Sequence, residues 1–196
     1  LFIIDFILVK SKEKRWRKVK DEIEYLVSRQ VYTLRDGLSF RVFHFIPDID
    51  QNTDKIKQIK NVAEQRHEFL RTLEIKDELE ILTLVNEDIL FDEITFLYFR
   101  NKKDNIWNMI NTKYSDFFNA ELISMLMELH INIIDLCSSI RQYNKHLIED
   151  DDETANYYKM IGMRTAIKSI TAMIYILNKL DSEGFSSPNR FRYISN

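Results

Sequence analysis

The stretch LISMLMELHINIIDLCSSIRQYNKHL, residues 122–147, decides the fold class because its apolar side chains recur in a heptad pattern. Successive apolar positions are separated alternately by four and three residues, and they are Leu122, Leu126, Leu129, Ile133, Leu136, Ile140, Tyr143 and Leu147. This spacing predicts a helix of about 30 residues, starting after Asn119, with one face buried against helices that cross it at about 20°.

Similar stripes continue on both sides of this segment. On its carboxyl side, a stripe from Met160 to Leu177 predicts a second long helix that ends near Gly184. The acidic run 149–153 predicts the turn between them, with carboxylates at the positive end of the following helix.

On the amino side, the pattern predicts three further helical regions. A first helix is expected over residues 12–45, ended by Pro47, with a kink or a close helix contact at Gly37. A second is expected over residues 56–73, followed by a break at residues 74–77. One long helix, or two in series, is expected over residues 79–117, with an interruption at 101–105.

Glycine and proline are scarce, and neither occurs between residues 48 and 161. Hairpin turns and phosphate-binding loops need glycine, so this composition disfavours both. We therefore predict an all-α fold: a bundle of about five long, mostly antiparallel helices with coiled-coil-like packing. The bundle is expected over residues 10–184, with a tail over 185–196.

The amino terminus reads LFIIDFILV over residues 1–9, eight apolar positions interrupted by Asp5. Nine helical residues rise only about 14 Å, so this segment is too short to span a bilayer but fits the end of a transmembrane helix. Residues 10–20 follow with seven Lys or Arg and one acid, in a chain whose net charge is −3. The predicted membrane-proximal basic patch is Lys10, Lys12, Lys14, Arg15, Trp16, Arg17, Lys18 and Lys20.

Basic residues accumulate on the cytoplasmic side of a membrane, and Trp favours the headgroup layer. The pattern therefore favours a membrane-anchored protein whose helical domain is cytoplasmic and touches an anionic membrane surface. Asp5 supports the alternative of a soluble cytoplasmic protein in which residues 1–9 are core. A signal-peptide remnant or an interfacial helix fits less well, because the basic residues follow the apolar run.

The sequence Arg-Trp-Arg-Lys-Val at residues 15–19 resembles the junction of an uncharacterised prokaryotic family of membrane-anchored proteins. In that family, amino-terminal transmembrane helices lead into a helical cytoplasmic domain. A second likeness covers residues 110–122, where Tyr114 precedes the Glu121-Leu122 helix start. The resemblance implies a topology, and it implies no activity or catalytic residue.

Candidate chemistry is sparse. Glu64 and His67 have the Glu-x-x-His spacing of di-iron bundles, but no other histidine has a Glu three residues before it, so we expect no metal there. The acidic run 149–153 lacks the spacing of a calcium loop. Ser138, Ser139 and Ser169 lack the glycines of a nucleophile elbow.

The remaining candidates are apolar. Cys137 lies among apolar neighbours and is expected to be a buried residue, not a catalytic thiol. Five clustered aromatic residues are expected to pack in the core or at a helix interface, with a ligand pocket as the alternative: Phe91, Phe96, Tyr98, Phe99 and Trp107.

The leading hypothesis is a non-enzymatic domain without a cofactor that acts through a protein partner or as a homo-oligomer. The first alternative is a soluble helical bundle that binds a small apolar ligand or a metal in its core. The second is nucleic-acid binding through residues 10–20, aided by Arg29, Arg35 and Arg41; the acidic remainder of the chain opposes it.

Overall fold

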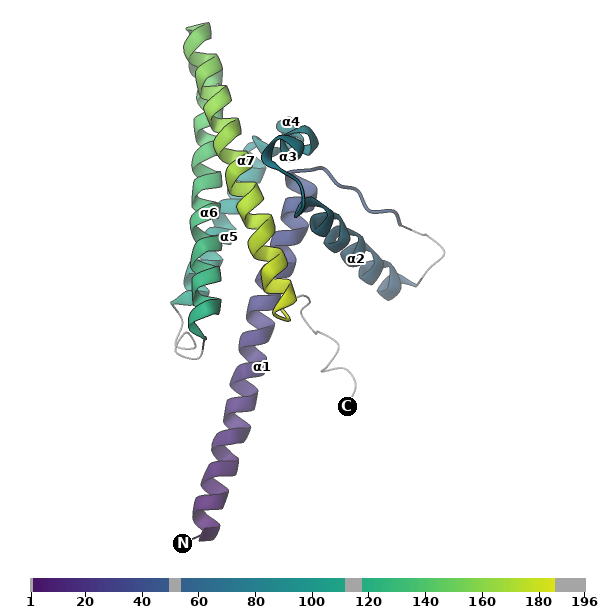
Figure 1. The fold of residues 1–196 in the computed structure, drawn as a ribbon, viewed down its shortest axis with the longest axis vertical. Helices are drawn as coiled ribbons and strands as arrows, with labels where there is room; N and C mark the ends of the chain where they lie inside the picture. The colour runs from purple at the N-terminus through teal and green to yellow at the C-terminus, as the bar shows by residue number, and fades with distance from the viewer. Residues whose placement is uncertain (1, 50–53, 112–117, 186–196) are drawn as a thin grey trace.

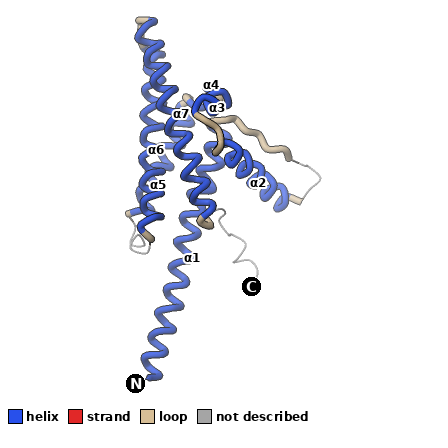
Figure 2. Tube along the Cα trace, in the orientation of Figure 1, coloured by secondary structure: helices blue, strands red, loops and turns tan. Residues whose placement is uncertain are grey.

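The computed structural model describes residues 2–49, 54–111 and 118–185, with side chains from Val19 onward. Within these ranges it contains seven α-helices, one 3-10 helix and no strand (Figures 1 and 2). The all-α prediction is therefore confirmed for this part of the chain. The helices are α1 Phe2–Arg41, α2 Lys55–Leu73, α3 Glu78–Leu84, α4 Glu87–Leu90, α5 Glu93–Ile110, α6 Ala120–Asn144, η2 Lys145–Ile148 and α7 Asp152–Ser182.

The helices α6 and α7 form a long hairpin that lies against α5 (Figure 1). Seven of the eight predicted heptad positions on α6 are buried, whereas Leu147 is 71% exposed because it lies in η2, beyond the end of the helix. The side chain of Asn119 accepts a hydrogen bond from the Leu122 amide at 2.7 Å and so caps α6. Coiled-coil-like, mostly antiparallel packing of the whole bundle stays a prediction.

Both ends of α7 follow local sequence signals. Asp151, within the acidic run, accepts a hydrogen bond from the Thr154 amide at 2.8 Å and caps the amino end. At the other end Gly184 has φ +96, and the Phe185 amide donates to the Leu180 carbonyl at 3.0 Å. This is a Schellman motif, which needs a residue in the left-handed region, so the predicted stop at Gly184 is confirmed. Residues 186–196 of the predicted tail lie outside the described residues.

The boundaries predicted for the first helix were wrong at both ends. Helix α1 already begins at Phe2 and ends at Arg41, four residues before Phe45. It ends early because the chain turns at His44, which has φ 50, and directs Phe43 and Phe45 onto Phe69 of α2. The ring centroids lie 5.5 Å and 4.4 Å from that of Phe69.

The predicted break at residues 74–77 is confirmed, and Asp77 forms a capping box with Glu80 at the start of α3. The interruption predicted at 101–105 is wrong, because α5 runs through these residues. The breaks lie instead between α3, α4 and α5. There the Asn86 side chain caps α4, and the Asn86 backbone N–H donates to the Val42 carbonyl. Helix α5 ends at Ile110, and residues 112–117 lie outside the described part.

Two glycines allow helices to approach closely. A Cβ on Gly37 of α1 would lie 2.3 Å from the Tyr98 ring of α5, so the predicted close contact at Gly37 is present. A Cβ on Gly162 of α7 would lie 2.5 Å from the backbone nitrogen of Tyr143 on α6. A ring can shift, but the backbone of a packed helix cannot do so without moving the hairpin.

We therefore expect Gly162→Ala to destabilise the protein by about 1–3 kcal/mol, the usual range for overpacking a filled interior. Chemical denaturation followed by circular dichroism measures this as a lower midpoint at unchanged slope. Thr165→Ala, on the exposed surface one turn later, is the control and should stay within about 0.5 kcal/mol of wild type. Equal stability of the two variants would contradict the tight contact.

Candidate functional site

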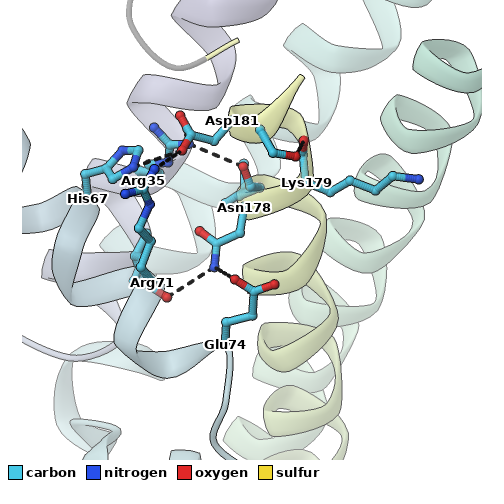
Figure 3. Close-up of polar contacts among 10 residues, drawn as sticks. Arg35, His67, Arg71, Glu74, Asn178, Lys179 and Asp181 are labelled. Carbon is cyan, nitrogen blue, oxygen red and sulfur yellow. Dashed lines mark hydrogen bonds and ion pairs between the residues drawn. The ribbon is translucent and has the colours of Figure 1, made fainter. Parts of the chain in front are cut away.

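The main polar feature of the described core is a charged cluster around Asp181, in the last turn of α7 (Figure 3). Asp181 is only 8% exposed, so its carboxylate needs charged or hydrogen-bonding partners. Three side chains reach it: Arg35 Nη2 lies 3.1 Å from Oδ1, and His67 Nε2 and Arg71 Nη2 lie 2.9 and 3.1 Å from Oδ2. The cluster thus joins α1, α2 and α7.

Each partner is positioned by its helix. Arg35 lies in the apolar stripe of α1 beside Leu34 and Leu38, is 3% exposed, and also donates to the Leu177 carbonyl at 3.3 Å. His67 and Arg71 are four residues apart on α2, so they project from one face of that helix.

A second contact lies one turn earlier on α7. The Asn178 amide nitrogen donates to the Leu70 carbonyl at 3.3 Å. It also donates to Glu74 Oε2 at 3.1 Å, as Figure 3 shows. Both acceptors belong to the carboxyl end of α2, whose last carbonyls have no partner within the helix. Asn178 therefore fixes the end of α2 against α7.

Burial governs the electrostatics of the cluster. Burial lowers the pKa of Arg35, and the nearby Asp181 carboxylate opposes this shift. Burial is also the largest cause that lowers the pKa of His67, followed by the positive charge of Arg35. His67 is therefore neutral at pH 7, and its Nε2–H donates to an Asp181 carboxylate that two guanidinium groups already share.

Glu64 and His67, the predicted Glu-x-x-His pair, are not brought together at a site. Glu64 is exposed, while His67 contacts Asp181 on another helix. Among the described residues, no group of three or more His, Cys, Asp or Glu side chains is arranged to hold a metal ion.

Sequence reasoning missed the role of Arg35, which was assigned with Arg29 and Arg41 to a nucleic-acid surface. Because Arg35 is buried in an ion pair, that assignment is wrong for this residue. Its position inside an apolar stripe was the available signal. Asp181 gave a similar signal, since it directly follows Leu180 on the buried side of α7.

Lys20 is the one member of the predicted basic patch whose side chain is described, and it is exposed. The side chains of the other members lie outside the described residues: Lys10, Lys12, Lys14, Arg15, Trp16, Arg17 and Lys18. Their backbone belongs to α1.

The apolar candidates mostly lie in the core. Cys137 is buried, as predicted, and burial raises the pKa of its thiol to about 11. Of the aromatic cluster, Phe91, Phe96 and Phe99 are buried, and Tyr98 packs against the core with its ring edge-on to Phe99. Trp107 is about half exposed and stacks on His130.

The acidic run 149–153 is exposed at the tip of the α6–α7 hairpin. Nearby, Glu87 of α4 accepts hydrogen bonds from Tyr143 of α6 and Lys159 of α7, and these bonds lower its pKa. These two contacts hold α4 against the α6–α7 hairpin.

Two surface grooves lie along α7. One, of about 420 Å³, separates α6 from α7 and is lined mostly by polar residues, including Asp135, Ser139, Thr165 and Lys168. The other, of about 400 Å³, lies where α2, α3, α6 and α7 meet and is lined partly by acids, namely Glu74, Glu78 and Glu128. Both grooves are open to solvent, unlike the closed apolar cavity expected for a small-ligand bundle.

Comparison of the chain with protein-family models, curated proteins and solved structures gives no match. The resemblance at residues 15–19 therefore stays a prediction. Two segments, Ala120–Ile148 and Asp152–Ser182, are long and apolar enough to cross a membrane by length and composition, and each is half buried in the fold.

Asp181→Asn leaves the buried Arg35 guanidinium without its counter-charge, so we expect a loss of about 3–5 kcal/mol in the free energy of unfolding. Chemical denaturation measures this loss. The double variant Arg35→Met Asp181→Leu, which removes both charges, should recover most of the stability. Glu183→Gln, exposed two residues later, is the control, and equal stability of Asp181→Asn and this control would contradict the cluster's role.

Proposed function

We propose that the chain is a non-enzymatic helical domain held at the cytoplasmic face of a membrane by its amino-terminal segment. It acts there through contacts with a protein partner or with copies of itself. The observation that carries this proposal is the course of α1, which runs unbroken through 40 residues while its amino-terminal half projects beyond the bundle (Figure 1).

The dimensions of α1 suit such a tether. At 1.5 Å per residue, 40 residues extend about 60 Å. The first described side chain packed against the core is Val19, so the bundle-packed part begins about 25 Å from the amino end. The projecting half contains the apolar residues 2–9 followed by the basic segment that starts at Lys10, in the order expected at a cytoplasmic membrane boundary.

We interpret α6 and α7 as core helices instead of membrane spans. Asp135 and Lys168 lie near the middle of these helices and are exposed. An ionised side chain there would cost about 2.5–3.5 kcal/mol at the bilayer centre. Insertion as a hairpin would also carry the acidic run 149–153 across the membrane.

Exposed apolar side chains support the proposed protein contacts. Ile75, before α3, is 90% exposed, and Ile148, at the hairpin tip, is 84% exposed. Leu79 and Leu147 are their exposed neighbours. Clustered apolar side chains in water are typical of interaction surfaces.

Membrane attachment predicts that the chain sediments with vesicles of phosphatidylcholine and phosphatidylglycerol (3:1) more strongly than with phosphatidylcholine alone. Each basic residue near the surface contributes about 1 kcal/mol. Replacing Lys10, Lys12, Lys14, Arg15, Arg17 and Lys18 by Gln should therefore weaken binding at least about 100-fold, and added salt should weaken the wild type.

The matched control replaces six exposed basic residues of the bundle by Gln: Arg29, Lys55, Lys57, Arg100, Arg164 and Lys168. It should retain most of the binding. An equal loss in both variants would indicate a general charge effect. Strong binding to neutral vesicles that neither variant weakens would indicate apolar insertion and would contradict attachment through the basic residues.

Self-association predicts a sedimentation coefficient that rises with concentration between about 1 and 100 μM, where weak specific contacts form. Two double variants test the two apolar sites: Ile75→Ser Leu79→Ser and Leu147→Ser Ile148→Ser. At least one of them should reduce the rise of the sedimentation coefficient with concentration. Glu149→Gln Asp150→Asn, beside Ile148, is the control. If both apolar variants behave like wild type, these side chains do not form the self-contact.

A further inference from the structure

Helix α2 is attached to the rest of the fold mainly through polar groups. Of its described side chains, only Leu70 and Leu73 are buried, both in its last turn. Phe69 adds a half-buried aromatic contact with Phe43 and Phe45 of the segment after α1. Its polar contacts include the Asp36–Arg66 ion pair at 2.9 Å, two hydrogen bonds between Gln65 and the Asp48 backbone, the Asn178 hydrogen bonds and the Asp181 cluster.

His67 is the member of this cluster that titrates near neutral pH, since the ordinary histidine pKa is about 6.5. Its side chain is 20% exposed, so protons can reach it from solvent. The charged groups around it are Asp181 on α7, Arg35 on α1, and Arg71 and Glu68 on α2 itself.

Protonation of His67 would add a third cation to one carboxylate. Asp181 and Glu68 attract the imidazolium, but Arg35 and Arg71 repel it, and burial removes its hydration. Together these effects lower the pKa of His67 in the docked helix below 6.5. A released α2 therefore binds the proton more tightly than a docked one, so docking is fully stable above about pH 6.5 and weakens as the pH falls.

We propose that His67 and the Asp181 cluster form a proton-sensitive latch, in which protonation of His67 weakens the docking of α2 and favours its release from α1 and α7. Release separates Leu70 and Leu73 of α2 from the core that they share with α1 and α7. It therefore exposes an apolar surface on α2 and another on the core that α2 had covered. The latch needs no membrane attachment in order to respond to pH.

Hydrogen exchange of the full chain, measured by mass spectrometry at pH 7.5, 6.5 and 5.5 and corrected for intrinsic exchange rates, tests the latch. At pH 5.5, one unit below the ordinary pKa, a single titrating group can shift the opening equilibrium by up to about tenfold. We expect amides of α2 to lose protection by up to that factor, while amides of α6 do not.

His67→Gln places an uncharged N–H donor near the position of Nε2 and should abolish the pH response of α2. His146→Gln is the matched control, because His146 is also partly exposed but lies at the hairpin tip, and it should respond like wild type. NMR titration of the His67 ring should give a pKa below 6.5. A pKa above 6.5, equal pH responses of wild type and His67→Gln, or a uniform loss of protection in α2 and α6 would each overturn the latch.

Discussion

The pairing of one buried carboxylate with two guanidinium groups holds together three helices that meet at Asp181. A carboxylate in the protein interior is strongly unfavourable unless cations and hydrogen-bond donors replace its hydration. Asp181 obtains them from Arg35 of α1 and from His67 and Arg71 of α2, so its burial requires both helices to be in place. The position of α2 depends on this requirement, because its buried apolar surface comes from only two residues in its last turn.

The described fold therefore combines two kinds of packing. The α6–α7 hairpin is joined by continuous apolar stripes, and Gly162 lets the two backbones approach closely. Apolar packing is broad and insensitive to small changes in solution conditions. Helix α2 is joined largely by ion pairs and hydrogen bonds, whose strength depends on charge and protonation. A response to pH is accordingly expected at α2 and not within the hairpin.

How much could be predicted from the sequence depended on whether the signal was local. The heptad from Leu122 to Tyr143, the cap at Asp151 and the stop at Gly184 are local patterns, and the structure follows them. The short helices α3 and α4 were missed because seven and four residues cannot display a helical period, and their signals are the single caps Asp77 and Asn86. The apolar stripes around Arg35 and Asp181 signal that both are buried, but the Asp181 cluster could not be predicted, since the two residues lie far apart in the chain and periodicity does not show which charged residues pair.

The two ends of α1 connect the proposed tether to the cluster without a flexible joint. The helix is unbroken from Phe2 to Arg41, and Arg35 lies near its carboxyl end, in contact with Asp181. An α-helix of this kind resists axial compression and bending because each turn is hydrogen-bonded to the next. If the amino-terminal half is held at a membrane, a rotation or axial shift of α1 against the bundle would displace the Arg35 guanidinium relative to α7. The buried carboxylate tolerates little displacement of its partner, so the cluster is the point in the fold at which motion of the tether and docking of α2 are physically coupled.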